Sequence, residues 1–243
     1  MVNFVALDST AHRAKRVMTA PSARFGDNLT MVGVVPREFA RLVAHYPIFL
    51  RKNNDNGLFE PGALLGFSAN ENLFLEGERW DSAYVPLHIQ SRPFRFLKSE
   101  GGRDGVERNG LAVAIDMDSP RVQDDEGEVM FLEGGKASDY LDRIVAILSE
   151  LVAGTRAAHH FAAKLADLDL IESVRIDVEF LDGSETKLQG LYSVSRERLA
   201  RLGGHQLAEL RDLGFLELVY FMLASMGHIS ALVARRNRRM TGA

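Results

Sequence analysis

The segment from Tyr46 to Pro93 constrains the fold of this chain more than any other. It contains the single tryptophan, Trp80, and four of the seven prolines. Aromatic, proline and charged residues alternate here too closely for a plain amphipathic helix or strand. The segment therefore predicts either a densely packed unit or a binding surface.

Composition sets the broad class of protein. The chain has 243 residues, of which 46% are hydrophobic and 26% are charged, as is typical of a soluble globular protein with a substantial core. A net charge of −4 gives no reason to expect nucleic-acid binding. Because the chain has no cysteine, disulfides, thiolate nucleophiles and cysteine-ligated metal sites are excluded. The segment Met1 to Ala20 lacks the apolar run of a secretory signal, which favours a cytoplasmic location.

The first half of the chain predicts short, mostly antiparallel strands. Residues 1–30 show no sustained period, so we expect a flexible N-terminal arm there. Pro36 suits the start of a helix that runs to about Ala44. The turn residues Asn53 to Gly57 predict a hairpin between two of the strands, and a Gly-rich loop is expected at 100–110. The expected strands are 31–35, 47–51, 63–67, 72–75, 94–98 and 111–116, with a helical turn or two at 83–90.

The second half predicts helices and one hairpin. Ser138 is a suitable N-cap for a helix that Gly154 and Thr155 interrupt. Strict alternation over 174–180 indicates a half-buried strand that returns over 187–194. Helices are then expected to about residue 235.

These elements together predict the α+β class, with a β-rich N-terminal half and a helix-rich C-terminal half containing a β-hairpin. We expect one domain over residues 31–235, followed by a basic C-terminal tail over residues 236–243.

Two aspartates could carry metal or acid–base chemistry. Asp116 and Asp118 lie two residues apart at the end of an expected strand, so both can project from the same side. Such a pair could bind Mg²⁺ or Ca²⁺, or transfer protons. The alternative is a turn in which the aspartate binds its own backbone. The histidines show no recognisable ligand spacing, and we predict no metal site and no cofactor.

The aromatic segment offers a second group of candidates. Its aromatic and polar side chains could form a ligand pocket, a protein interface or simply part of the core. All three interpretations stay open at this point. The candidate binding residues, including the two aspartates, are Tyr46, Asn72, Arg79, Trp80, Asp81, Tyr84, Arg92, Asp116 and Asp118.

Motifs of nucleophilic catalysis and phosphate binding are missing from the sequence. There is no Gly-x-Ser-x-Gly elbow, no phosphate-binding Gly-rich loop ending in Lys-Ser/Thr and no Gly-x-Gly-x-x-Gly. No residue is assigned a catalytic role, and the sequence leaves open whether the protein is an enzyme.

An apolar segment near the C-terminus allows three interpretations. Residues 215–234 are long enough to span a bilayer, and the basic run 235–239 follows them. Glu217 and His228 would be costly at membrane depth, which favours a buried helix or a homodimer helix over 215–235. The basic run could still attract anionic lipid or an acidic partner.

Several blocks of the sequence resemble the SapC family, bacterial proteins named from surface-layer loci. The resemblance covers residues 35–235 and is distinct from the peptide-uptake permease of the same name. The blocks are Tyr46-Pro-Ile-Phe-Leu, Ala63-Leu-Leu-Gly-Phe, Glu71-Asn-Leu-Phe-Leu, Arg79-Trp-Asp, Tyr84-Val-Pro, Arg92-Pro-Phe, Ile115-Asp-Met-Asp-Ser-Pro-Arg-Val, Leu181-Asp-Gly-Ser and Leu188-Gln-Gly-Leu-Tyr.

The resemblance implies a link to surface layers and to genes for TonB-dependent receptors and flavin-dependent tryptophan-halogenase-like enzymes. It carries over no catalytic residue. Our first hypothesis is a cytoplasmic accessory protein without catalytic activity, which binds a protein of such a system through the Tyr46–Pro93 surface. The second is an enzyme or cofactor-binding protein acting on a peptide, amino-acid or glycan-derived small molecule near Asp116 and Asp118. The third is a peripheral component of the inner membrane.

Overall fold

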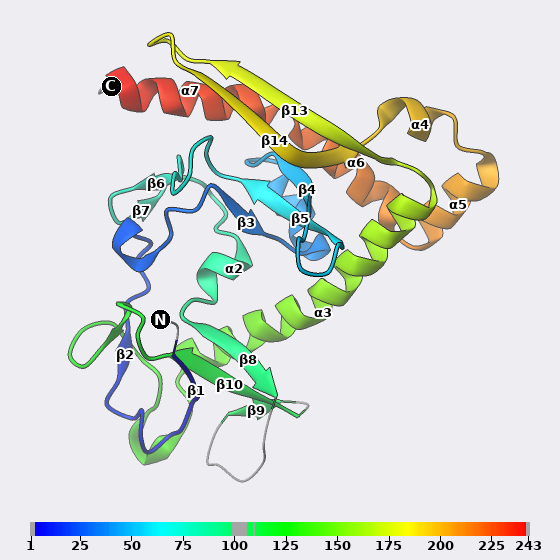
Figure 1. Cartoon of the computed structure of the whole chain (residues 1–243). Coiled ribbons are helices and arrows are strands. Elements are labelled where there is room, and N and C mark those ends of the chain that lie inside the picture. Colours follow the sequence, from blue (N-terminus) through cyan, green and yellow to red (C-terminus); the bar gives the residue numbers. More distant parts are fainter. Residues whose placement is uncertain (1–2, 99–105, 109, 242–243) are drawn as a thin grey trace. The chain divides into compact units, whose positions relative to one another are not determined.

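A computed structural model describes residues 3–98, 106–108 and 110–241 of the chain (Figure 1). The loop expected at 100–110 falls mostly outside these residues. Contacts divide the chain into two compact units. The single domain expected over 31–235 stays a prediction. The first unit comprises residues 1–27, 77–80 and 87–152, and the second comprises 28–76, 81–86 and 153–243.

The first unit contains two small antiparallel sheets. In one, β10 (Leu111–Asp116) pairs with β1 (Phe4–Ala6), β8 (Phe94–Lys98) and β9 (Glu107–Arg108). In the other, β2 (Arg16–Val17) lies between β11 (Val122–Gln123) and β12 (Glu128–Val129). The strands expected at 94–98 and 111–116 are confirmed.

The N-terminal residues differ from the flexible arm that the sequence suggested. They supply β1, β2 and the 3₁₀ turn η1 (Ala23–Phe25), and they bury Leu7, Val17 and Phe25. Short strands of two or three residues give almost no periodic signal in a sequence. These strands are held in place by pairing with strands about a hundred residues further along the chain. Phe4, for example, pairs with Asp116.

Short elements and part of one long helix complete the first unit. The short elements are β7 (Arg79–Trp80), α2 (Leu87–Gln90) and η3 (Glu133–Gly135). The long helix is α3 (Asp139–Asp167), whose first half belongs to this unit. Ser138 caps it as predicted, because its Oγ accepts a hydrogen bond from the Leu141 N–H at 3.2 Å.

The second unit is built on a five-stranded antiparallel sheet. Its strand order is β13–β14–β4–β5–β3. The antiparallel sheets and the mixed helix and strand content confirm the α+β class. The strands are β3 (Met31–Gly33), β4 (Ile48–Lys52), β5 (Phe59–Leu64), β13 (Ile171–Glu179) and β14 (Glu185–Val194).

The hairpin of β4 and β5 forms as predicted, although β5 begins four residues before the expected strand. Pro61 lies within β5, just beyond the residues Gly62–Leu64 that pair with β3. A proline cannot donate a hydrogen bond to a neighbouring strand, and Pro61 therefore suits the position where pairing with β3 ends.

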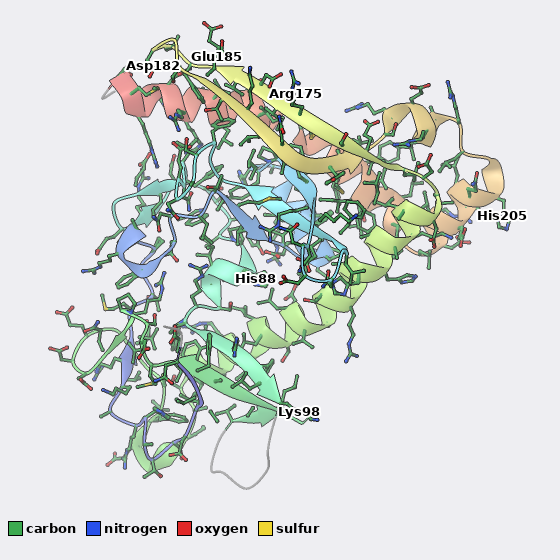
Figure 2. The ribbon with its side chains drawn as sticks, in the orientation of Figure 1. His88, Lys98, Arg175, Asp182, Glu185 and His205 are labelled. Carbon is green, nitrogen blue, oxygen red and sulfur yellow. The ribbon has the colours of Figure 1, made fainter. Side chains whose placement is uncertain are left out.

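The second predicted hairpin, β13 and β14, extends beyond the sheet. Only Leu191 and Tyr192 of β14 pair with β4, and the end of the hairpin nearer its turn lies along α7 (His228–Thr241) (Figure 1). At its tip, the Leu181 N–H donates to Asn237 Oδ1 at 3.1 Å. Charged side chains that include Arg175, Asp182 and Glu185 project from the hairpin (Figure 2).

The helices of the second unit enclose an aromatic core. Phe161 of α3 makes edge contacts with Phe39 and Phe215, with ring centroids 6.1 and 5.4 Å apart. α7 extends to Thr241, so residues 236–241 of the expected tail are helical. The remaining elements are η2 (Pro36–Glu38), α1 (Phe39–Leu42), β6 (Leu75–Glu76), α4 (Arg196–Ala200), α5 (Gly204–Asp212) and α6 (Phe215–Ser225).

Gly154 does not interrupt α3, contrary to the expectation from the sequence. A Cβ at this position would lie 2.5 Å from Cβ of Val35, closer than such atoms approach. The glycine therefore permits close packing of the helix against the chain at Val35, and its low helix propensity is offset by the rest of the helix.

We expect Gly154→Ala to destabilise the protein by about 1–3 kcal/mol, because the added methyl overpacks against Val35. Alanine is intrinsically better than glycine in a helix by about 1 kcal/mol, so the sign of the change is diagnostic. Urea unfolding measures it. The control is Gly204→Ala in α5, where a Cβ meets no atom within 4 Å. Equal effects in both variants would contradict the close-packing explanation.

Candidate functional site

The candidate residues proposed from the sequence divide between the two units. Five belong to the first unit, namely Arg79, Trp80, Arg92, Asp116 and Asp118, and four belong to the second, namely Tyr46, Asn72, Asp81 and Tyr84.

A chain of hydrogen bonds joins two tyrosines to a buried carboxylate in the second unit. The Tyr46 hydroxyl donates to the Tyr84 carbonyl, and the Tyr84 hydroxyl donates to Glu38 Oε1 at 2.9 Å. Glu38 Oε2 accepts from the Val35 N–H at 2.9 Å. Tyr46 and Glu38 are 0% and 1% exposed. Glu38 was missed by sequence reasoning, although Pro36 followed by an acid two residues later is a common helix start.

Tyr84 keeps its proton in this arrangement. Burial, and then the neighbouring Glu38 carboxylate, raise the pKa of Tyr84 above its ordinary value. The hydroxyl therefore stays a donor to Glu38 at physiological pH and in mild alkali.

Arg41 lies over the ring of Tyr84, with its guanidinium carbon 5.4 Å from the ring centroid. Arg41 is exposed and Tyr84 is partly buried. The two side chains therefore present a cation and an aromatic ring at the surface of the second unit. The hydrogen bonds to Glu38 and from Tyr46 hold the tyrosine in this position. We call them the Arg41–Tyr84 pair.

Asp81 is held by α7. Arg235 forms an ion pair with the Asp81 carboxylate and donates to the Asp81 carbonyl at 2.9 Å. Its guanidinium also lies 4.5 Å from the ring centroid of Phe74. Phe74 in turn packs on Tyr46, with ring centroids 4.5 Å apart. Asp81 thus links the aromatic segment to the C-terminal helix.

Two further arginines of α7 contact the same segment. Arg236 forms an ion pair with Glu71 and donates to Ser68 Oγ at 3.0 Å. Arg239 donates to the Leu75 carbonyl at 2.6 Å. Three of the four arginines in the basic run therefore bind residues 68–75 or Asp81 of the same unit, and Arg238 is the exception among the described residues. The basic run therefore stabilises the fold in addition to placing positive charge at the surface.

Asn72 shapes the turn within this segment. It is 3% exposed, and its Oδ1 accepts from the Phe74 N–H at 3.0 Å. This contact is a local Asx turn, which fixes the backbone without requiring any ligand.

In the first unit, a turn forms at Asp116 and Asp118, but its side-chain acceptor is Asp116 and not Asp118 of the expected Asp118-Ser-Pro turn. Asp116 Oδ1 accepts from the Asn3 N–H at 2.8 Å and from the Asp118 N–H at 3.2 Å. Asp118 is exposed. Across the described residues, no three His, Asp or Glu side chains are grouped so as to hold a metal ion. A binding role for the two aspartates stays a prediction.

Arg92 takes part in a buried charge cluster that the sequence did not reveal. It donates to the Gly26 carbonyl at 2.6 Å and lies 3.5 Å from Asp27 Oδ1. Asp27, 0% exposed, also pairs with Arg121, which is 2% exposed and donates to the Met18 carbonyl at 2.7 Å. Asp27 lay in the expected flexible arm, so no periodic signal indicated its burial.

The neighbours Arg79 and Trp80 lie in β7 and differ in burial. Trp80 is 8% exposed, whereas Arg79 is exposed. Burial of Trp80 agrees with the core interpretation of this residue.

The structure thus defines an α+β protein in which hydrogen bonds and ion pairs hold Tyr46, Asp81 and Tyr84 within the second unit. A family model described as SapC matches residues 7–232. The chain belongs to the SapC family. No curated protein and no solved structure matches the chain.

One helical span in the described part of the chain, Phe215–Thr241, is long and apolar enough to cross a membrane by length and composition. Core helices of soluble proteins pass the same test. The span includes α6, α7 and the two-residue turn between them.

We expect Tyr84→Phe to destabilise the protein by about 1–3 kcal/mol, because buried Glu38 loses a hydrogen-bond donor. Urea unfolding at neutral pH provides the measurement. Tyr192→Phe serves as the control, since this residue packs its ring on Phe59 and no hydrogen bond to its hydroxyl is found among the described residues. Equal changes in the two variants would show that the bond to Glu38 contributes nothing.

We expect Trp80→Ala to cost about 3–5 kcal/mol of unfolding free energy, because a large buried side chain is removed. Thermal unfolding followed by circular dichroism avoids reliance on the lost fluorophore. Leu132→Ala, at a residue that is 44% exposed in the first unit, is the control and should change little. A Trp80→Ala protein with a normal melting temperature would exclude a core role.

Proposed function

We propose that this SapC-family protein is an accessory protein without catalytic activity of its own. It binds another protein of a surface-layer, nutrient-uptake or tailoring-enzyme system. The family resemblance supports the type of system, including a TonB-dependent receptor or a flavin-dependent halogenase-like enzyme as the partner. The proposal also takes the protein to be cytoplasmic.

The observation that carries the proposal is the Arg41–Tyr84 pair. Tyrosine and arginine are enriched among the residues that dominate binding energy at protein interfaces. Tyr84 is fixed at its hydroxyl by Glu38 and at its carbonyl by Tyr46, so little side-chain entropy is lost when a partner covers it. A fixed aromatic ring beside an exposed cation suits a partner surface that carries carboxylates and apolar groups.

Other residues of the Tyr46–Pro93 segment have a supporting role in this proposal. Tyr46 and Asn72 are buried, and Asp81 is paired with Arg235. These residues hold the segment in place, and the contact itself falls on its accessible part at Tyr84. The proposed surface is therefore narrower than the full segment considered from the sequence.

We expect Arg41→Ala to weaken partner binding at least about tenfold while leaving the melting temperature unchanged, since Arg41 is exposed. Wild-type protein is first used to capture the partner from host lysate, and the identified partner is then titrated by calorimetry. Arg156→Ala is the matched control, because Arg156 is an exposed arginine of the second unit on α3.

Native mass spectrometry of the purified protein separates this proposal from its alternatives. A retained small molecule or metal would replace it with the enzyme or cofactor-binding hypothesis. Equal binding by the Arg41→Ala and Arg156→Ala proteins would remove the Arg41–Tyr84 pair from the contact.

A further inference from the structure

Seven exposed residues form a regular stripe along α6 and α7. They follow one another at alternating steps of three and four, which keeps them on one side of a helix. We call this set the outer stripe. It consists of Glu217, Tyr220, Ala224, Gly227, Ala231, Ala234 and Arg238, all exposed.

The outer stripe is apolar between two opposite charges. Tyr220 is 56% exposed, and the next four members are alanine or glycine. Glu217 stands at one end and Arg238 at the other, and neither forms an ion pair with another described residue. Arg238 differs in this from Arg235 and Arg236, which pair with Asp81 and Glu71.

The spacing of the outer stripe is nearly symmetric about Gly227, and its two ends carry opposite charges. Ala224 and Ala231 flank it, Tyr220 and Ala234 follow, and Glu217 and Arg238 are the outermost members. When a second copy lies antiparallel with Gly227 near the twofold axis, Glu217 meets Arg238 of the partner subunit, and the reverse contact forms as well. A parallel arrangement would instead place like charges opposite each other, which is destabilising.

We propose that the outer stripe is the interface of a twofold homodimer in which α6 and α7 pack antiparallel on the same helices of a second copy. The occupant is a second copy, because an antiparallel copy brings a matching charge to both ends of the outer stripe at once. The small residues at the centre allow helix axes to approach to about 8 Å, at the short end of helix packing distances. This inference does not depend on the Arg41–Tyr84 pair.

The size of the interface sets the expected affinity. The span Phe215–Thr241 has 27 residues and is about 40 Å long at ~1.5 Å per residue. A contact roughly 10 Å wide, a typical helix diameter, covers about 400 Å² per subunit, half of the ~800 Å² in a standard stable interface. A contact of this size belongs to the weak, transient class, so we expect a dimer that dissociates on dilution and not an obligate one.

The test is analytical ultracentrifugation of the full chain between about 1 and 200 μM. We expect wild-type protein to dimerise over this range. The Glu217→Arg and Arg238→Glu proteins should each dimerise at least about tenfold more weakly, because like charges then meet at both ends. The double variant should recover most of the wild-type affinity, since the pairs are restored in reverse. Glu172→Arg, an exposed charge reversal on β13, should have no effect.

A second variant tests the packing separately from the charges. Ala231→Trp places a bulky ring at the centre of the outer stripe and should abolish dimerisation. Ala231 is exposed, so circular dichroism should show an unchanged fold.

Three results would overturn the proposal. One is a monomer at every concentration, and another is a dimer that neither charge reversal weakens. The third is a monomer that sediments with vesicles of phosphatidylglycerol and phosphatidylcholine and loses this binding in the Arg238→Glu protein, because the anionic lipid then loses its basic partner. That last result would assign the outer stripe to a membrane surface.

Discussion

The organisation of the second unit depends on the ion pairs between α7 and the aromatic segment. Arg235 binds Asp81 and Arg236 binds Glu71, across 154 and 165 residues of chain. The two pairs are only partly exposed, with arginine side chains 21% accessible, so each is screened less than a surface pair. They hold the part of the segment in which Phe74 packs on Tyr46 and Tyr84 is hydrogen-bonded to Tyr46 and to Glu38. The placement of Tyr84 at the surface follows from this arrangement.

The sequence predicted the elements that carry a strong periodic signal. The alternation at 174–180, the turn at Asn53–Gly57 and the cap at Ser138 each led to the element that the structure contains. The failures have local causes. The low helix propensity of Gly154 predicts an interruption, whereas its role, the close approach of Val35, is a tertiary contact that no local pattern records. The two- and three-residue strands of the N-terminal segment are likewise stabilised by distant partners.

The candidate residues were found more easily than their roles. Trp80 and Asp81 are adjacent in sequence, yet they belong to different units, so the segment that seemed to form one surface is divided. Glu38 and Asp27 were missed because a lone acid in a helix start or a loop gives no sign of burial. Asp116 was correctly placed at a strand end, and a turn follows it, but the side chain that accepts its hydrogen bonds is Asp116 and not Asp118. Whether any candidate residue binds a partner depends on chemistry outside the chain.

The long sequence separation of the α7 contacts has a consequence for biosynthesis. A chain that emerges from its N-terminus exposes Glu71, Asp81 and the aromatic rings beside them long before Arg235 and Arg236 have left the ribosome. During that interval the segment has apolar surface and carboxylates without their final partners, a state open to aggregation or to chaperone capture. Completion of the second unit is therefore a late event in synthesis.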